Sequence, residues 1–409
     1  MLQTVDVGMN SLDDYKLLIR DEKANEIRIL ARELHGARIL HLNATPYGGG
    51  VSELLRSEVP LLRDLGLHAD WKIIFGDQKF FSVTKSFHNA LQGAEFILDD
   101  EVKEIYLSYN VRNAQLLEEQ YDYIIVHDPQ PLALLHFKGK GHSKWIWRCH
   151  IDTSQPNLEV WNFLKPLAEE HDAAIFTLEE FVPPGFRMAK ISVIPPAIDP
   201  ISPKNMPISA DLCRRVINWV GVDLRRPLLT QVSRFDPWKD PLGVIDVYRM
   251  VQEDVPDLQL ALVGAMALDD PEAWQIYSTI SEYDKKDPNA FVFTNLTGVG
   301  NIEVNAFQQL SDVVIQKSIR EGFGLVVSET LWKETPVVAG KTGGIPLQLE
   351  DGVSGFLCQS NEDYARKISY LFGNKKEARA MGSRGKQRVR EEFLIPRLVA
   401  DELRTLCSL

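Results

Sequence analysis

Two glutamates separated by seven residues lie on either side of a glycine-containing turn. Glu321 and Glu329 bound the segment EGFGLVVSE, in which the turn is predicted to open a helix. The first N–H groups of a helix have no partner within it, so those at Phe323, Gly324 and Leu325 are expected to face a ligand. We predict that Glu321 binds sugar hydroxyls and that Glu329, about two turns into the helix, binds a ribose diol. The spacing favours this interpretation over a helix start with a capping acid.

A pair of cations follows a predicted strand at 228–232. The segment SRFDPWK at 233–239 places Arg234 and Lys239 in one loop. Arginine presents a planar fork and lysine a compact charge, so the pair is suited to a diphosphate. Such cations stabilise negative charge that grows on a departing diphosphate. An isolated Arg–Lys pair of this kind more often consists of solvated surface residues, so this interpretation depends on the neighbouring motifs.

Three successive glycines follow another predicted strand, at 37–42. They lie in NATPYGGGVSE at 43–53, where Gly49 and Gly50 let backbone N–H groups approach a ligand in front of a helix N-terminus. The pattern is neither the dinucleotide fingerprint G-x-G-x-x-G nor a P-loop. A flexible loop is the alternative, but the position at the end of a strand favours ligand binding.

Histidines and aspartates follow two further predicted strands, at 123–126 and 145–148. His127 and Asp128 come after the first, and His150 and Asp152 after the second. Their positions at strand ends predict that His150 faces the ligand and that His127, Asp128 and Asp152 bind hydroxyls of an acceptor. A purely structural role is the open alternative, above all for the three acceptor residues.

The elements that must position these residues alternate between short apolar strands and longer amphipathic helices. Further strands are predicted at 71–75, 173–176, 258–264, 291–294 and 312–316, and helices at 50–65, 158–170 and 242–251. This alternation predicts an α/β protein with parallel sheets covered by helices. The prolines in IPPAID at 194–199 interrupt it and predict a hinge. We therefore expect domains at 1–197 and 198–390, and an amphipathic helix at 391–409 that packs locally or crosses back onto the first domain.

Composition excludes several classes of partner. Lys and Arg number 45 against 57 Asp and Glu, so a net charge of −12 argues against binding nucleic acid or anionic membranes. The first residues are not expected to be a secretory signal, and no apolar run is long enough to span a membrane. Four scattered cysteines lack zinc-site spacing and fit reduced thiols in the cytoplasm. Because there is no Asp-x-Asp motif, we expect no cofactor and no essential metal, with a divalent ion at most stimulatory.

The motifs together resemble glycosyltransferase family 4. Glu321 and Glu329 match its E-x7-E motif, Arg234 and Lys239 its diphosphate pair, and GGIPLQLEDGVSGFL at 343–357 its GGIPE…DGxxGFL segment. The sequence departs from the family at Gln348, where an acid is usual nearby, and in the residues DPW of the basic loop. The resemblance implies the GT-B fold, in which two Rossmann-like domains border the active site, and a retaining transfer by front-face displacement.

Four longer segments are similar to the trehalose glycosyltransferring synthases. They are NATPYGGGVSELL, VHDPQP at 126–131, RCHIDTS at 148–154 and SRFDPWKD at 233–240. This resemblance implies a nucleoside-diphosphate glucose donor, a free glucose acceptor, a trehalose product and reversible transfer. It implies that His150 hydrogen-bonds the donor sugar near the reacting centre, and by analogy it suggests a homodimer.

Three alternatives remain open at this stage. The first is another retaining family 4 enzyme with a different acceptor, and a phosphorylated acceptor would need extra cations such as those in KGKGHSK at 138–144, which we interpret as a surface turn. The second is a nucleotide-sugar 2-epimerase. The third is a non-catalytic nucleotide-sugar sensor, which would not need Glu321, Glu329, Arg234, Lys239 and His150 together. The sequence does not predict which nucleotide is preferred.

Overall fold

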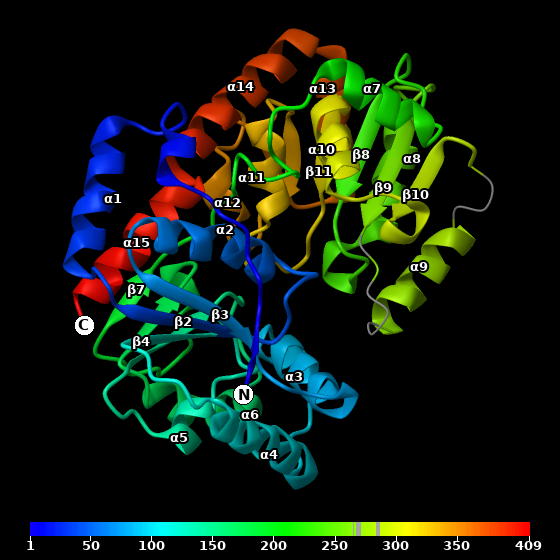
Figure 1. Ribbon diagram of the computed structural model, residues 1–409. Helices are drawn as coiled ribbons and strands as arrows, with labels where there is room; N and C mark the ends of the chain where they lie inside the picture. Colours follow the sequence, from blue (N-terminus) through cyan, green and yellow to red (C-terminus); the bar gives the residue numbers. More distant parts are fainter. Residues whose placement is uncertain (265, 267–270, 284–286) are drawn as a thin grey trace. The chain divides into compact units, whose positions relative to one another are not determined.

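The computed structural model describes residues 1–264, 266, 271–283 and 287–409, and its contacts divide the chain into two compact units (Figure 1). Unit 1 comprises Met1–Ala197 and Ile395–Leu409, and unit 2 comprises Ile198–Leu394. The chain passes from unit 1 to unit 2 directly after Pro195 and Pro196, where the sequence predicts a hinge. We describe each unit by itself.

Unit 1 is built around one sheet whose order is β1-β3-β2-β4-β5-β6-β7. Every neighbouring pair is parallel except the antiparallel pair of β1 with β3 at one edge. The strands are β1 (Gln3–Thr4), β2 (Arg38–Asn43), β3 (His68–Ile73), β4 (Tyr123–His127), β5 (Lys144–Cys149), β6 (Ala173–Phe176) and β7 (Ile191–Val193). The helices are η1 (Leu12–Tyr15), α1 (Asp21–Glu33), α2 (Gly50–Asp64), α3 (Gln78–Leu91), α4 (Asp100–Leu116), α5 (Leu134–Lys138), α6 (Leu158–Glu169), η2 (Glu179–Phe181) and α15 (Ile395–Cys407).

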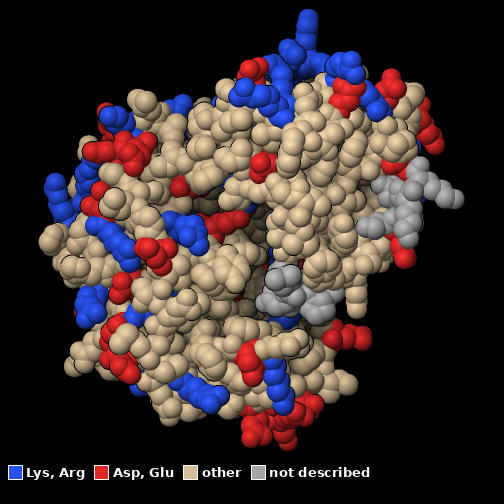
Figure 2. Space-filling view, turned by 45° about the vertical axis from the view of Figure 1, so that its right-hand side comes forward, with Lys and Arg blue, Asp and Glu red and all other residues tan. Residues whose placement is uncertain are grey.

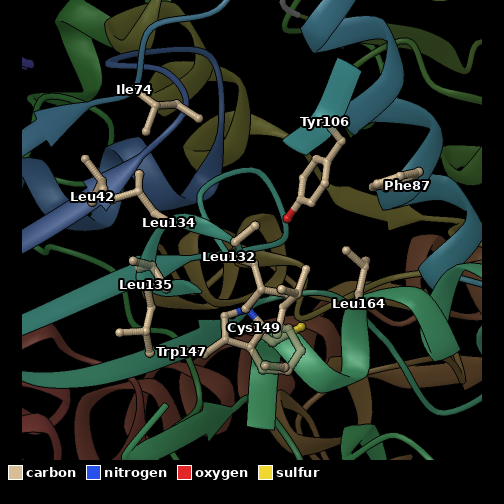
Figure 3. Packing of buried hydrophobic residues seen from close by; sticks show 14 of the residues in the cluster. Leu42, Ile74, Phe87, Tyr106, Leu132, Leu134, Leu135, Trp147, Cys149 and Leu164 are labelled. Atoms are coloured by element: carbon tan, nitrogen blue, oxygen red, sulfur yellow. The ribbon is translucent and has the colours of Figure 1, made fainter. Parts of the chain in front are cut away.

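The pleat of the unit 1 strands separates an apolar face from one on which polar and charged residues lie among apolar ones. In β5, Trp145, Trp147 and Cys149 point into a large apolar cluster with residues of α3, α4 and α6, shown in Figure 3. Because side chains alternate along a strand, Arg148 points to the opposite face, where it meets α2 and α15. One face of this sheet is thus an ordinary core, and the other face buries charge.

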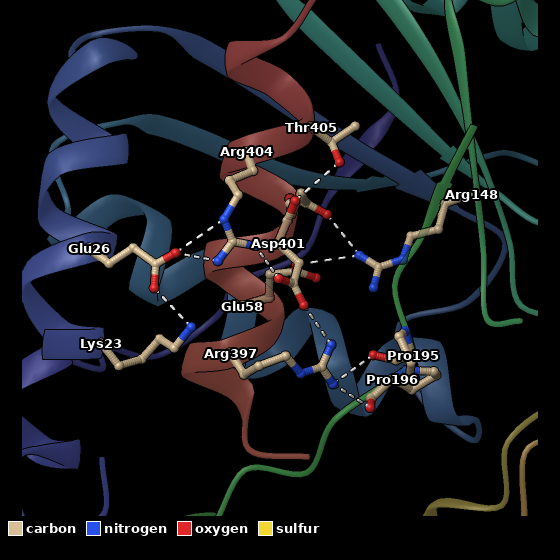
Figure 4. A network of polar contacts seen from close by, with 11 residues as sticks. Lys23, Glu26, Glu58, Arg148, Pro195, Pro196, Arg397, Asp401, Arg404 and Thr405 are labelled. Atoms are coloured by element: carbon tan, nitrogen blue, oxygen red, sulfur yellow. Dashed lines mark hydrogen bonds and ion pairs between the residues drawn. The ribbon is translucent and has the colours of Figure 1, made fainter. Parts of the chain in front are cut away.

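The C-terminal helix α15 belongs to unit 1, where it packs against α1 and α2. It begins at Ile395, later than the predicted start at 391, because α14 continues to Glu392 and Pro396 fits only the first turn of a new helix. Arg397 donates hydrogen bonds to the carbonyls of Pro195 (2.8 Å) and Pro196 (2.9 Å), which ties the start of α15 to the end of the first segment (Figure 4).

Unit 2 contains a fully parallel sheet of order β10-β9-β8-β11-β12-β13. Counted along the chain, this is the 3-2-1-4-5-6 order of a Rossmann fold. The strands are β8 (Leu228–Val232), β9 (Gln259–Gly264), β10 (Ala290–Thr294), β11 (Val313–Gln316), β12 (Val337–Gly340) and β13 (Phe356–Cys358). The helices are α7 (Ala210–Trp219), η3 (Pro237–Lys239), α8 (Pro241–Gln252), α9 (Pro271–Tyr283), η4 (Asn295–Thr297), α10 (Asn301–Leu310), α11 (Leu325–Trp332), α12 (Ile345–Gln348), α13 (Asn361–Gly373) and α14 (Lys375–Glu392).

Both faces of the unit 2 sheet are covered. Leu260 and Leu262 of β9 pack in a cluster with α8 and α13, whereas Ala261 and Val263 pack in another with α7 and α10. Strands buried on both faces explain the continuous apolar runs in the sequence. The predicted α/β class with two parallel-sheet, Rossmann-like domains is therefore confirmed.

Candidate active site

The basic loop and the first glutamate of unit 2 come from adjacent strands. β8 ends at Val232 and β11 at Gln316, and these two strands pair at the point where the strand order reverses. Ligands of open parallel sheets bind outside the carboxyl ends of the strands at such a switch point. The topology thus brings residues more than 80 positions apart to one place.

Lys239 and Glu321 are in direct contact there. The Nζ of Lys239 lies 2.7 Å from the Oε2 of Glu321. The same carboxylate oxygen accepts a hydrogen bond from Ser318 Oγ at 3.0 Å. Glu321 is 8% exposed, so its position is determined by these contacts. The predicted cation and the predicted sugar-binding acid therefore form one preorganised group.

The residues DPW of the basic loop are structural. Asp236 caps η3 by accepting a hydrogen bond from the N–H of Trp238 at 2.9 Å. The N–H of Ile319 donates to the carbonyl of Trp238 at 2.8 Å, which joins this loop to the one after β11. Arg234 lies 3.4 Å from Asp236 and its side chain is 46% exposed. The guanidinium remains accessible to a ligand, whereas Lys239 is fixed.

The turn before α11 is held by close backbone packing with the 343–344 turn. Gly324 has φ +83°, a left-handed conformation that favours glycine. A Cβ on Gly343 would lie 1.7 Å from the carbonyl oxygen of Glu321, so only glycine fits there. The GG pair of the sequence motif therefore supports the Glu321 loop.

Gln348, at the departure from the family pattern, clamps the start of α11. Its Oε1 accepts hydrogen bonds from the N–H (2.9 Å) and Oγ (2.6 Å) of Ser328, and its Nε2 donates to the carbonyl of Phe323 at 2.5 Å. An amide can accept and donate in this way, whereas an ionised acid can only accept. The ring of Phe323 packs against Phe393, so only backbone at this position is offered to a ligand.

Glu329 is buried and lies nearer to the start of its helix than the sequence predicts. Because α11 begins at Leu325, Glu329 is four residues into the helix, about one turn rather than two. It is 2% exposed, accepts a hydrogen bond from Gln308 at 3.0 Å and lies 3.5 Å from Lys204 Nζ. Its neighbour Lys333 donates to the Glu329 carbonyl at 3.0 Å, and burial lowers the pKa of Lys333 to about 7.

In unit 1 the glycine loop follows β2, as predicted. α2 begins at Gly50 with Gly49 as its N-cap, and an added Cβ at Gly48 or Gly49 would meet no described atom within 4 Å. Asn43 shapes the loop by accepting a hydrogen bond from Trp71 Nε1 (2.8 Å) and donating to Thr45 (2.8 Å). The glycine backbone therefore faces open space at a helix N-terminus.

His127, Asp128 and His150 form a connected group at the carboxyl ends of β4 and β5. His127 Nδ1 lies 3.0 Å from His150 Nε2, and the rings are stacked with centroids 5.3 Å apart. Asp128 adopts φ +62° and accepts a hydrogen bond from the His150 N–H at 2.8 Å. Desolvation raises the pKa of Asp128 to about 7 and keeps the pKa of both imidazoles well below the usual value.

Asp152 has a local role in the structure. It is 6% exposed and accepts hydrogen bonds from the N–H (3.1 Å) and Oγ (2.6 Å) of Ser154, which close a turn. The structure thus brings His127, Asp128 and His150 together, and Asp152 supports the segment that follows them. A role of Asp152 in acceptor binding stays a prediction.

Sequence reasoning missed three buried residues on the polar face of unit 1, namely His41, Glu58 and Glu402. One potential metal-ligand atom from each of the three residues lies within 4.8 Å of the others, and all three side chains are completely buried. These residue types occur in metal sites, but Arg148 Nη1 contacts Glu402 at 2.7 Å and Glu58 at 3.4 Å. The positive charge among these carboxylates therefore comes from Arg148. In the sequence, His41 interrupts the apolar strand at 38–43 and Glu58 lies on the apolar face of the helix at 50–64. These two polar residues were the signals that could have revealed the cluster.

On the face seen in Figure 2, acidic and basic side chains are intermixed, as expected of solvated surface. No helix among the described residues has both the length and the apolar character required to cross a bilayer.

Family models match most of both units. The model described as "Trehalose synthase, N-terminal domain" matches residues 41–183, and that described as "Glycosyl transferases group 1" matches residues 218–388. The sequence is 54% identical to trehalose synthase of Rubrobacter xylanophilus, with 100% of this chain and 99% of the relative covered. It is 48% identical to trehalose synthase of Thermococcus litoralis, with 94% and 93% covered.

A solved structure shares the fold at low sequence identity. The α,α-trehalose-phosphate synthase (UDP-forming) from Burkholderia xenovorans, in complex with glucose-6-phosphate, superposes with a TM-score of 0.72 at 15% identity, covering 91% of this chain and 100% of that one. Two Rossmann-like units with an E-x7-E pair and a basic loop at the switch point define a GT-B glycosyltransferase. Within that class, the chain belongs to the trehalose synthase family.

Proposed function

We propose that this glycosyltransferase makes trehalose from a nucleoside-diphosphate glucose and free glucose, reversibly and with retention at the anomeric carbon. The observation that carries the proposal is the contact of Lys239 with Glu321 at the switch point of unit 2. It places a cation suited to a diphosphate beside a carboxylate suited to sugar hydroxyls. The relatives named trehalose synthase support glucose as the transferred sugar.

In the proposed mechanism, unit 2 binds the donor. Arg234 and Lys239 bind the diphosphate, Glu321 and the N–H groups around Gly324 bind the sugar, and Glu329 binds the ribose. The bond from the anomeric carbon to the phosphate oxygen breaks as the acceptor oxygen attacks the same face. The acceptor's hydroxyl proton passes to a phosphate oxygen, so the leaving group is its own base. The protein contributes positioning and electrostatic stabilisation.

Unit 1 supplies neutral imidazoles and the acid Asp128, whose pKa is raised to about 7, and these groups suit an unphosphorylated sugar. His150 is assigned to the donor sugar, and His127 and Asp128 to glucose. The basic segment at 138–144 precedes or begins β5, whereas His150 follows the end of that strand. The cations lie at the opposite end of β5, and Lys140 is paired with Asp172 at 2.9 Å. This placement favours free glucose over a sugar phosphate as the acceptor.

The proposal is tested by proton NMR of the purified protein with UDP-, ADP- or GDP-glucose and free glucose. A new α,α-linked disaccharide with released nucleotide is the expected result. A parallel reaction contains glucose 6-phosphate in place of glucose. Disaccharide formed only in that reaction would show that the acceptor is a sugar phosphate. Nucleotide release without any disaccharide would overturn the assignment of trehalose as the product. An unchanged spectrum with every donor would favour a non-catalytic sensor.

We further propose that no metal ion or cofactor is essential, because Lys239 and Arg234 meet the charge of the diphosphate. Activity is expected to persist after dialysis against EDTA. Complete loss that added Mg²⁺ restores would contradict this. The free cysteines, of which Cys149, Cys213 and Cys358 are buried, are consistent with the reducing cytoplasm to which we assign the reaction.

A further inference from the structure

Three histidines form a hydrogen-bonded row on the polar face of the unit 1 sheet. His41 of β2 and His127 of β4 share this face because they alternate with core residues Leu42 and Val126. His41 Nδ1 lies 3.2 Å from His127 Nε2, and His127 Nδ1 lies 3.0 Å from His150 Nε2. The row thus runs from the buried interior to the half-buried His150 at the strand end.

The inner end of the row faces the C-terminal helix. His41 Nε2 and Glu402 Oε1 are both buried and lie 3.5 Å apart, and neither atom has a hydrogen-bond partner among the described residues at this separation. Glu402 Oε2 accepts a hydrogen bond from Arg148 Nη1 at 2.7 Å, and Figure 4 shows Arg148 directed toward the helix that carries Asp401 and Arg404. Glu402 therefore connects Arg148 to the histidines.

The protonation states follow from burial. Desolvation lowers the pKa of His41 to about 3 and of His127 and His150 well below the usual value, so each ring is neutral and carries one N–H. Burial and the neighbouring Glu58 raise the pKa of Glu402, and the hydrogen bond from Arg148 to its Oε2 opposes this rise. A row of neutral imidazoles must be oriented head to tail, because each contact needs one donor and one acceptor.

One end of the row then determines the other. If Glu402 Oε1 accepts from His41 Nε2–H, His41 Nδ1 must accept from His127 Nε2–H. His127 Nδ1 must in turn accept from His150 Nε2–H. The second ring nitrogen of His150 is then left without a proton.

We propose that Glu402 is a positioning residue that acts through His41 and His127 to hold His150 in the Nε2–H tautomer, so that its Nδ1 accepts a hydrogen bond from a sugar hydroxyl. The identity of the ligand as a sugar rests on the proposed function, whereas the tautomer does not. A residue 252 positions further along the chain thereby sets the hydrogen-bonding character of the site residue.

Glu402→Gln is expected to reverse the row. Arginine has only N–H donors, so the amide oxygen of the new glutamine must face Arg148. Its NH2 group then faces His41 and donates to Nε2. Each ring must shift its proton, and His150 becomes the Nδ1–H tautomer. Glu58→Gln is the matched control, because it removes a carboxyl that contacts the same Arg148 but leaves Glu402 facing His41.

The test is two-bond proton–nitrogen NMR of full-length protein with ¹⁵N-labelled histidine, without substrate, with the His150 signal assigned by its loss in His150→Asn. Wild type and Glu58→Gln are expected to show Nε2–H, and Glu402→Gln to show Nδ1–H. The proposal is overturned if wild-type His150 carries its proton on Nδ1, a result that requires no variant to fold. It is also overturned if folded Glu402→Gln keeps the wild-type tautomer.

Kinetics provide a second readout. Glu402→Gln is expected to lower kcat/KM by about tenfold, in line with the loss of one hydrogen bond to the reacting sugar. The affinity for nucleoside diphosphate alone is expected to be unchanged. If the wild-type protein is inactive but His150 shows the predicted tautomer, the proposed function is rejected and the role of Glu402 in the histidine row is retained.

Discussion

The two units share a parallel-sheet architecture but present opposite chemistry at the ends of their strands. In unit 2 the site residues form ion pairs, as in Lys239 with Glu321 and Lys204 with Glu329. In unit 1 they are neutral imidazoles hydrogen-bonded in a row, and the charges of Arg148 and its acids lie behind them. The two units thus carry different sites on a similar fold, one built on ion pairs and one built mainly on neutral imidazoles.

The difference indicates which part of the reaction each unit serves. A diphosphate is a concentrated negative charge, and cations fixed in a partly buried loop bind it strongly. Sugar hydroxyls carry no charge, and neutral donors and acceptors distinguish them by geometry. In the proposed mechanism, unit 2 therefore binds the diphosphate and unit 1 binds the hydroxyls of the acceptor.

Removing the fixed cation of unit 2 is expected to have the largest effect. Lys239→Ala should lower kcat by about 100-fold or more, since the growing charge on the diphosphate loses its partner. Steady-state kinetics with saturating donor measures this. Lys386→Ala, which removes an exposed lysine paired with Glu334, is the control and should leave kcat unchanged. Normal turnover in Lys239→Ala would remove the diphosphate assignment.

The buried carboxylate of unit 2 is expected to matter next. Glu329→Gln keeps the shape of the side chain and removes its charge. Loss of one charge-assisted hydrogen bond should raise the donor KM by about 10- to 100-fold with a smaller change in kcat. Glu377→Gln, at an exposed pair with Arg384, serves as control. If the donor KM is unaltered, Glu329 has only a structural role beside Gln308 and Lys204.

A smaller effect is expected from Asp128, an acid of the unit 1 site. The pKa of Asp128 is raised to about 7, so its ionised fraction grows between pH 6 and pH 8. If the ionised form binds glucose, kcat/KM for glucose rises over that window. Asp128→Asn, which tolerates the left-handed backbone, should abolish the rise and lower kcat/KM about tenfold at pH 8. If kcat/KM for glucose rises between pH 6 and pH 8 in the variant as well, Asp128 is excluded as the source of the rise.

The smallest effect concerns stability in unit 2. The folded-state pKa of Lys333 is lowered to about 7 from 10.5, so between these values the unfolded chain binds the additional proton. The free energy of unfolding of the wild type therefore increases with pH across this window, by at most about 1.4 kcal/mol per pH unit. Lys333→Met should lack this increase in urea titrations at pH 7 and 9. Equal pH dependence in both proteins would show that Lys333 remains charged.

The sequence predicted nine of the thirteen strands of the described residues, because buried strands of parallel sheets read as apolar runs, but it missed the short strands β1, β7, β12 and β13. It placed Arg234 and Lys239 after one strand and Glu321 just before a helix, and the strand order then brought them together. It could not predict the strand order itself, which determines that β8 lies beside β11. The burial of Glu329 was also missed, because it results from packing beside Gln308 and Lys204, which the local sequence does not show.

The largest omission was the buried network of unit 1. His41 and Glu402 come from opposite ends of the chain, and only tertiary packing of α15 brings them to one place. In the sequence, Glu402 belongs to an amphipathic helix and resembles a solvated acid. A helical pattern shows which face is apolar but not which polar residue will be enclosed by a second element.

Calorimetric titration of UDP, ADP and GDP into wild type, Lys239→Ala and Asp128→Asn tests the assignment of chemistry to the two units most directly. The account predicts that at least one nucleoside diphosphate binds the wild type, that Lys239→Ala weakens this binding by about tenfold or more, and that Asp128→Asn leaves it unchanged. Equal binding to wild type and Lys239→Ala, with loss in Asp128→Asn, would contradict it.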